Sequence, residues 1–126
     1  MTLGEYRPIA AANVVEHADA QHYDRQWLII DDKRTWISTP ADLSGIDVSI
    51  RFGYLVLQAP GMLRLDIPMD VIEDDDSVRD TAKIGDQWVD IVDEGEVAAV
   101  WLTQHLGRGA RLVKIHPEAG DINWPS

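Results

Sequence analysis

The residues best suited to contact a ligand lie in the stretch Tyr23-Asp24-Arg25-Gln26-Trp27, with Trp36 nine residues further on. The guanidinium of Arg25 offers a planar fork of donors that matches carboxylates and phosphates and also stacks on aromatic rings. Trp36 is one of the tryptophans expected to be free of the core, so it can line a rim pocket with Arg25. The predicted ligand-binding residues are Tyr23, Asp24, Arg25 and Trp36.

A structural interpretation of the same stretch stays open. Arg25 could pair with Asp24 or Asp31 and only anchor the entrance of the strand that follows.

No recognisable catalytic or metal-binding pattern is present. His17, His22, His105 and His116 lack a metal-ligand spacing, and there is no cysteine to complete a zinc site or act as a nucleophile. The acidic run 73–76 lacks the order of a calcium loop, so residues 70–80 are expected to form a mobile surface loop. An independent enzyme would need Asp24 or Asp86 as acid or base, and neither has a recognisable orienting partner. We expect no catalytic residues, no metal and no cofactor of the chain's own.

Composition narrows the class of partner. The chain has 126 residues, with 22 Asp and Glu against 11 Lys and Arg, a formal net charge of −11. Such a charge repels phosphate backbones and anionic lipid, which argues against nucleic acid and membrane partners. Without cysteines, a signal-peptide pattern or an apolar run near the ~20 residues of a spanning helix, we expect a soluble cytoplasmic protein.

Residues 27–30 are expected to form the centre of the core. Trp-Leu-Ile-Ile is apolar at successive positions, which is typical of a strand covered on both faces. A charged turn at 32–34 predicts a hairpin back through residues 35–38. Trp88 and Trp101 are expected to join Trp27 in the core, whereas Trp36 and Trp124 are expected to be freer.

The rest of the chain is mostly strand-like, with one helix. Strands are also expected near residues 3–9, 13–17, 46–52, 54–57, 63–67, 82–84, 88–91 and 110–115, with a single helical or 3₁₀ turn within 38–45. Alternation places Ile46, Val48, Ile50 and Phe52 on one face. Residues 94–106 predict a helix with Ala98, Trp101, Leu102 and Leu106 on one stripe, a capping box from Asp93 and Glu96, and a stop at Gly107. The fold class is therefore mainly β, an antiparallel β-barrel or strongly bent sheet with one packed α-helix.

With these residues placed, the chain resembles the N-terminal β-barrel domain of MOSC proteins, the group that contains the C-terminal regions of molybdenum cofactor sulfurases and the amidoxime-reducing proteins. The resemblance covers residues 3–115 and implies a domain over 1–115 with an irregular tail at 116–126. It is carried by Tyr6-Arg7-Pro8-Ile9, Tyr23-Asp24-Arg25-Gln26-Trp27-Leu28, Trp36-Ile37-Ser38-Thr39, Leu57-Gln58-Ala59-Pro60-Gly61-Met62, Leu65-Asp66-Ile67-Pro68, Gly85-Asp86, Gly95–Leu102, Leu106-Gly107-Arg108 and Arg111-Leu112-Val113.

Departures from the family pattern bear on function. Where the family has Lys-Ser-Cys and a basic residue that approach the cofactor, this chain has Ala10-Ala11-Ala12-Asn13. The chain also passes directly from Thr39 to Pro40, where the family usually has a Gln or Arg pair. The catalytic MOSC domain expected after Val113 is absent from the sequence.

The favoured hypothesis is a non-catalytic accessory or binding domain, a free-standing version of the barrel that docks a protein partner or small ligand at the rim near Tyr23, Arg25 and Trp36. The alternative is a subunit of a split enzyme that completes a molybdenum-cofactor or sulfur-transfer site on a separately encoded MOSC protein.

Overall fold

The computed structural model describes residues 5–43, 45–69 and 79–124. None of the helices in these ranges is long and apolar enough to span a bilayer. In chain order the elements are η1 (Ala20–Tyr23), β1 (Trp27–Asp31), η2 (Pro40–Leu43), β2 (Asp47–Arg51), β3 (Tyr54–Gln58), β4 (Leu65–Pro68), β5 (Arg79–Ile84), β6 (Gln87–Asp93), α1 (Glu96–Leu106) and β7 (Ala110–Ile115).

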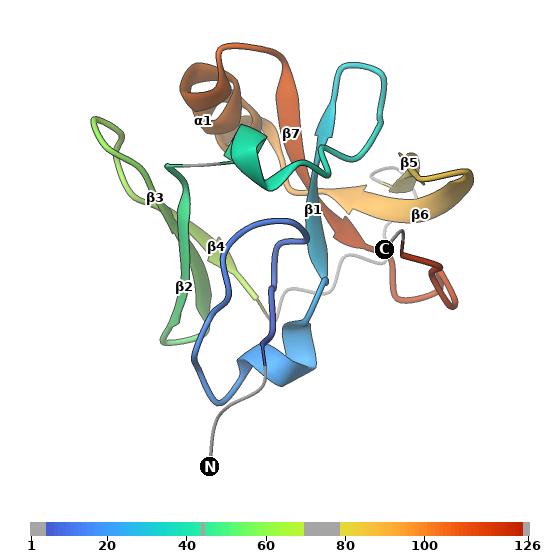
Figure 1. Cartoon of the computed structure of the whole chain (residues 1–126), viewed down its shortest axis with the longest axis horizontal. Coiled ribbons are helices and arrows are strands. Elements are labelled where there is room, and N and C mark those ends of the chain that lie inside the picture. Colours follow the sequence, from blue (N-terminus) through green and yellow to red (C-terminus); the bar gives the residue numbers. More distant parts are fainter. Residues whose placement is uncertain (1–4, 44, 70–78, 125–126) are drawn as a thin grey trace.

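The strands form two antiparallel sheets that curl into a half-barrel with α1 beside them (Figure 1). One sheet has the order β1-β7-β6-β5, and the other is the meander β2-β3-β4. The expected fold class, mainly β with a bent antiparallel sheet and one helix, is confirmed. The expected 3₁₀ turn within 38–45 is η2.

β1 lies at the centre of the core, as expected. Trp27, Leu28 and Ile29 are fully buried, and Ile30 is 2 % exposed. Successive side chains of a strand point to opposite faces. Trp27 and Ile29 accordingly pack in one apolar cluster with β2, β3 and α1, and Leu28 and Ile30 pack in a second with β5 and β6. The continuous apolar run thus reflects burial on both faces.

The opening segment differs from the expected pair of strands. Residues 5–17 contain only an isolated parallel bridge between Ile9 and Trp27. Local turns take up the backbone hydrogen bonds instead: the N–H of Ala12 donates to the Ile9 carbonyl, and the N–H of Val15 donates to the Tyr6 carbonyl. The predicted strands near 3–9 and 13–17 are wrong because these contacts curl the chain on itself. Residues 1–4 lie outside the described ranges.

Residues 35–38, expected to be the return arm of a hairpin, form isolated bridges to two different strands. Trp36 forms an antiparallel bridge to Ile30 of β1, while Thr35 forms a parallel bridge to Lys83 of β5. The arm therefore links the two edges of the four-stranded sheet and does not form a regular ladder with β1.

Two aromatic residues expected in apolar positions lie at the surface. Phe52 is 98 % exposed and has a φ of 52°, because residues 52 and 53 form the turn between β2 and β3. Trp88 is 60 % exposed, because its neighbour Val89 points into the core and alternation turns Trp88 outward. The core prediction holds for Trp27 and Trp101 and is wrong for Trp88.

Helix α1 has the expected buried stripe and stop. Ala98, Trp101 and Leu102 are buried, and Leu106 packs partly buried against the same cluster. Gly107 adopts φ 73° and donates its N–H to the Thr103 carbonyl.

The start of α1 differs from the prediction. The N-cap is Gly95, with no side-chain cap, and the Oδ1 atom of Asp93 accepts the Gly95 N–H at 2.7 Å. The predicted capping box is wrong because the side chains of Asp93 and Glu96 both bind Arg111 of β7.

The tail acts as a cover for the sheet over residues 116–124. Ala119, Ile122 and Trp124 pack partly buried against the cluster formed by Leu28 and Ile30. The surface loop expected at 70–80 lies outside the described residues at 70–78, and residues 79–80 begin β5.

Candidate functional site

The predicted rim begins where the chain leaves η1 and enters β1. Asp24 and Arg25 are exposed, and Tyr23 and Trp36 are half-buried. Arg25 has a left-handed φ of 54°, held by the hydrogen bond from its N–H to the Arg7 carbonyl at 2.7 Å. This conformation is unfavourable for a residue with a Cβ, so surrounding structure must impose it.

Arg25 and Trp36 come together through a third residue, Trp124. The Cζ atom of Arg25 lies 5.5 Å from the Trp124 ring centroid, within the range of a cation–π contact. Trp124 meets Trp36 edge-on, with ring centroids 5.0 Å apart. The Nε1 atom of Trp36 donates to the Ala10 carbonyl at 3.3 Å. We call Arg25, Trp36 and Trp124 the rim surface.

The other two predicted residues have structural contacts. Tyr23 stacks on Trp27 with ring centroids 5.7 Å apart and packs partly buried against the core. The Oδ1 atom of Asp24 accepts the Arg7 N–H at 2.8 Å. Arg25 forms no ion pair with Asp24 or Asp31 in these described segments, so the anchoring interpretation is wrong for Arg25.

Sequence reasoning missed Trp124 as a member of the rim surface. Its one signal was a large aromatic residue in a tail without periodicity, next to a proline. Which surface that ring would reach depends on the path of the tail, and no local pattern encodes the path.

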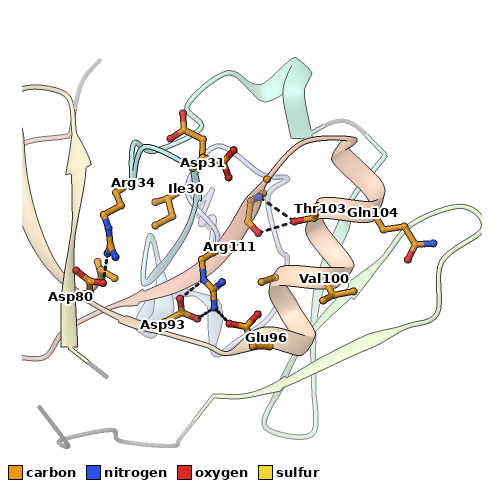
Figure 2. Close-up of a pocket in the computed structure, with 15 residues that line it drawn as sticks. Ile30, Asp31, Arg34, Asp80, Asp93, Glu96, Val100, Thr103, Gln104 and Arg111 are labelled. Carbon is orange, nitrogen blue, oxygen red and sulfur yellow. Dashed lines mark hydrogen bonds and ion pairs between the residues drawn. The ribbon is translucent and has the colours of Figure 1, made fainter. Parts of the chain in front are cut away.

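A second feature, also missed, is a cavity of about 620 Å³ beside α1 (Figure 2). We call it the α1 groove. Its walls come from the end of β1 and the turn after it, from β5, β6 and β7, and from one side of the helix. Five carboxylates and two guanidiniums line it: Asp31, Asp32, Asp80, Asp93, Glu96, Arg34 and Arg111.

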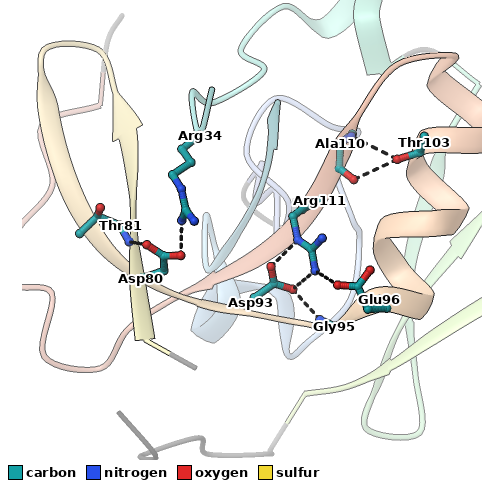
Figure 3. Close-up of polar contacts among 9 residues, drawn as sticks. All are labelled: Arg34, Asp80, Thr81, Asp93, Gly95, Glu96, Thr103, Ala110 and Arg111. Atoms are coloured by element: carbon teal, nitrogen blue, oxygen red, sulfur yellow. Dashed lines mark hydrogen bonds and ion pairs between the residues drawn. The ribbon is translucent and has the colours of Figure 1, made fainter. Parts of the chain in front are cut away.

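Arg111, one of the residues that line the α1 groove, joins three elements (Figure 3). Its Nε donates to the Oδ2 atom of Asp93 at 2.5 Å, and its Nη2 donates to the Oε1 atom of Glu96 at 2.7 Å. These hydrogen bonds that Arg111 donates, first to Asp93 and then to Glu96, raise the pKa of Arg111. Arg111 therefore stays charged and is already paired.

Arg34 and Asp80 form the second ion pair of the groove, across the turn after β1 and the start of β5. Burial pushes the pKa of Asp80 upward, but the hydrogen bonds from Arg34 and from the Thr81 N–H outweigh it and leave the pKa below its usual value. Asp80 is consequently ionised at neutral pH and, like Arg111, is paired.

Within the described ranges, no three His, Cys, Asp or Glu side chains are grouped so that they could hold a metal ion. Asp86, the other acid or base considered, lies exposed in the turn between β5 and β6.

Comparison with known proteins adds two relatives. A solved solution structure of a protein coded by a gene locus of Bordetella bronchiseptica superposes with a TM-score of 0.81 and is 47% identical, covering 100% of this chain and 98% of that one. The molybdenum cofactor sulfurase of Danio rerio is 29% identical over 101 residues, which is 76% of this chain. The chain spans 12% of the length of that sulfurase.

The family model described as the MOSC N-terminal beta barrel domain matches residues 8–109. This range includes the bridge at Ile9, strands β1 to β6 and α1, and it ends at the residue before β7. Both the sequence match and the half-barrel lead to one assignment: the chain belongs to the MOSC N-terminal β-barrel domain family.

Proposed function

We propose that this protein is a non-catalytic binding domain that docks a partner protein at the rim surface formed by Arg25, Trp36 and Trp124. The observation that carries the proposal is the contact between the exposed Arg25 guanidinium and the Trp124 ring, which in turn packs on Trp36. Arginine and tryptophan are the residues most enriched among the energetically important positions of protein interfaces.

The backbone at Arg25 supports the same proposal. A left-handed arginine costs roughly 1–2 kcal/mol relative to glycine, and such strain concentrates at functional positions. The Arg25 guanidinium contacts the Trp124 ring and, among the described residues, forms no ion pair with Asp24 or Asp31.

Affinity capture from a lysate of the source organism, with partners identified by mass spectrometry, tests the proposal. We expect Arg25→Gly to reduce recovery of a specific partner at least tenfold. Arg25→Gly accommodates the left-handed φ, so this change separates docking from folding. Arg64→Ala, at an exposed arginine just before β4 of the other sheet, is the matched control. Equal recovery by all three proteins would exclude the rim surface.

A second candidate function is a split-enzyme subunit acting with a separately encoded MOSC protein. It rests on the similarity to a molybdenum cofactor sulfurase, in which the matching segment is a small part of a much longer protein. Size-exclusion chromatography of the chain with a MOSC-domain protein of the same organism tests it. This candidate predicts a complex and a change in that protein's activity; separate elution with unchanged activity would contradict it.

The residues that the family resemblance places near a molybdenum cofactor do not fit that group here. Ala10 and Ala12 are buried and carry no polar side chain. Asn13 is committed to Val48, accepting its N–H at 2.7 Å and donating to its carbonyl at 3.0 Å. Residues 10–13 have no side-chain donor left for an anionic cofactor, so in the split enzyme the cofactor contacts would come from the partner.

A further inference from the structure

We propose that the α1 groove is a second docking surface and that its occupant is a segment of a partner protein bearing arginine or lysine side chains between apolar ones. The residues that line the α1 groove include none of the rim surface residues Arg25, Trp36 and Trp124, and the inference does not depend on the proposed function.

The helix presents an uncovered apolar face beside the groove. Val100 lines the groove and is 62 % exposed, and Val97, one helical turn earlier, is 76 % exposed. Other positions of α1 already supply the core through Ala98, Trp101 and Leu102. Valine is also a poorer helix former than alanine, so neither folding nor helix propensity explains these two exposed side chains.

The unpaired negative charge of the groove favours an occupant with positively charged side chains. Both guanidiniums are already paired, Arg111 with Asp93 and Glu96, and Arg34 with Asp80. Among the described residues, Asp31 and Asp32 lack a cationic side chain within ion-pair distance. The groove therefore has uncompensated negative charge, which attracts a guanidinium or ammonium group.

The two aspartates are held in place by the backbone around them. The Oδ1 atom of Asp31 accepts the N–H groups of Lys33 and Thr35 at 2.8 and 3.1 Å. The Asp32 carboxylate lies against Gly109, where a Cβ would overlap it. Position 109 thus leaves room for Asp32 between the turn after β1 and the start of β7.

An anionic ligand would meet no unpaired cation among the described groove residues, and the net charge of −11 would repel it during approach. A small polyamine would satisfy Asp31 and Asp32 but would leave Val97 and Val100 in water. A protein segment carrying both basic and apolar side chains covers the carboxylates and the valines together.

Isotope-edited NMR titration of the full chain at 150 mM salt provides the test. The probe is an acetylated, amidated hexapeptide of alternating leucine and arginine, and the comparison ligands are its citrulline counterpart and spermine. We expect shifts confined to the amides around Asp31, Asp32, Glu96 and Val100 with the arginine peptide. The citrulline peptide and spermine should each bind at least tenfold more weakly.

Matched variants separate the groove from net charge. Asp32→Asn should weaken peptide binding at least tenfold, while Asp47→Asn, equal in charge and exposed elsewhere, should change it less than twofold. Val100→Ser, which leaves every carboxylate in place, should weaken it at least threefold. Equal weakening by the two charge variants, binding unaffected by Val100→Ser, spermine binding as tight as the peptide, or shifts absent or spread over the surface would each overturn the proposal.

Discussion

At the scale of single residues, Arg111 of the α1 groove connects three elements. Its guanidinium binds a carboxylate from the end of β6 and another from the first turn of α1, while its own backbone belongs to β7. Asp93 also accepts the Gly95 N–H, so one carboxylate orients the helix start and the arginine together. Charge-assisted bonds of this kind are stronger than neutral ones, and their geometry suits the planar fork of arginine.

Replacing Arg111 by alanine should lower the free energy of unfolding by about 1–2 kcal/mol, because the half-buried Asp93 loses its cationic partner. Arg111→Lys keeps the positive charge but lacks the planar guanidinium, so its free energy of unfolding should lie between those of the parent protein and Arg111→Ala. Urea denaturation measures the effect, with Arg64→Ala as control, since its exposed pair with Asp66 should be worth no more than about 0.5 kcal/mol. Equal losses for Arg111→Ala and Arg64→Ala would contradict the role of Arg111.

At the scale of elements, the β2–β3 hairpin departs from the usual residue preferences of its turn. Its two-residue turn has positive φ at Phe52 and Gly53, 52° and 82°, which suits the right-handed twist of the flanking strands. Asparagine or glycine is the usual residue at the first of these positions, whereas an exposed phenylalanine there is strained.

Phe52→Asn should therefore raise the free energy of unfolding by about 0.5–1 kcal/mol, because asparagine tolerates the left-handed conformation and the exposed ring loses no packing. Leu63→Asn is the control, since Leu63 is 87 % exposed and lacks a positive φ, and it should change stability by less than about 0.5 kcal/mol. Thermal and urea unfolding measure the stability change of both variants relative to the parent protein. A loss of stability in Phe52→Asn would show that the ring makes a contact that stabilises the fold.

At the scale of the whole molecule, β1 is the strand on which the two apolar clusters meet. Trp27 and Ile29 belong to the cluster shared with the three-stranded meander and α1, and Leu28 and Ile30 belong to the cluster covered by the tail. β1 therefore contributes side chains to both apolar clusters, so a change in its packing affects both.

Leu28→Ala and Ile29→Ala should each lower the free energy of unfolding by about 2–5 kcal/mol, because both side chains are fully buried. In a sheet with only one buried face, two adjacent residues would point to different environments, and only one of the two substitutions would cause a large loss of stability. Chemical denaturation of both variants tests this, beside Leu63→Ala, which should stay within about 0.5 kcal/mol of the parent. A small effect for either β1 variant would mean that one face is not closed over the strand.

The sequence by itself determined the elements that depend on neighbours along the chain. The apolar run of β1, the alternation of β2, and the stripe and glycine stop of α1 are local patterns, and the structure contains each of them. The family assignment follows from the order of such patterns along residues 8–109.

Tertiary structure alone decided the surfaces. The irregular path of residues 5–17, the outward turn of Trp88, the arrival of Trp124 on Trp36 and the meeting of five elements around the α1 groove all depend on contacts between residues far apart in sequence. Periodicity and capping encode how a segment relates to its immediate neighbours, whereas the packing of whole elements decides which side chains from distant segments share a surface.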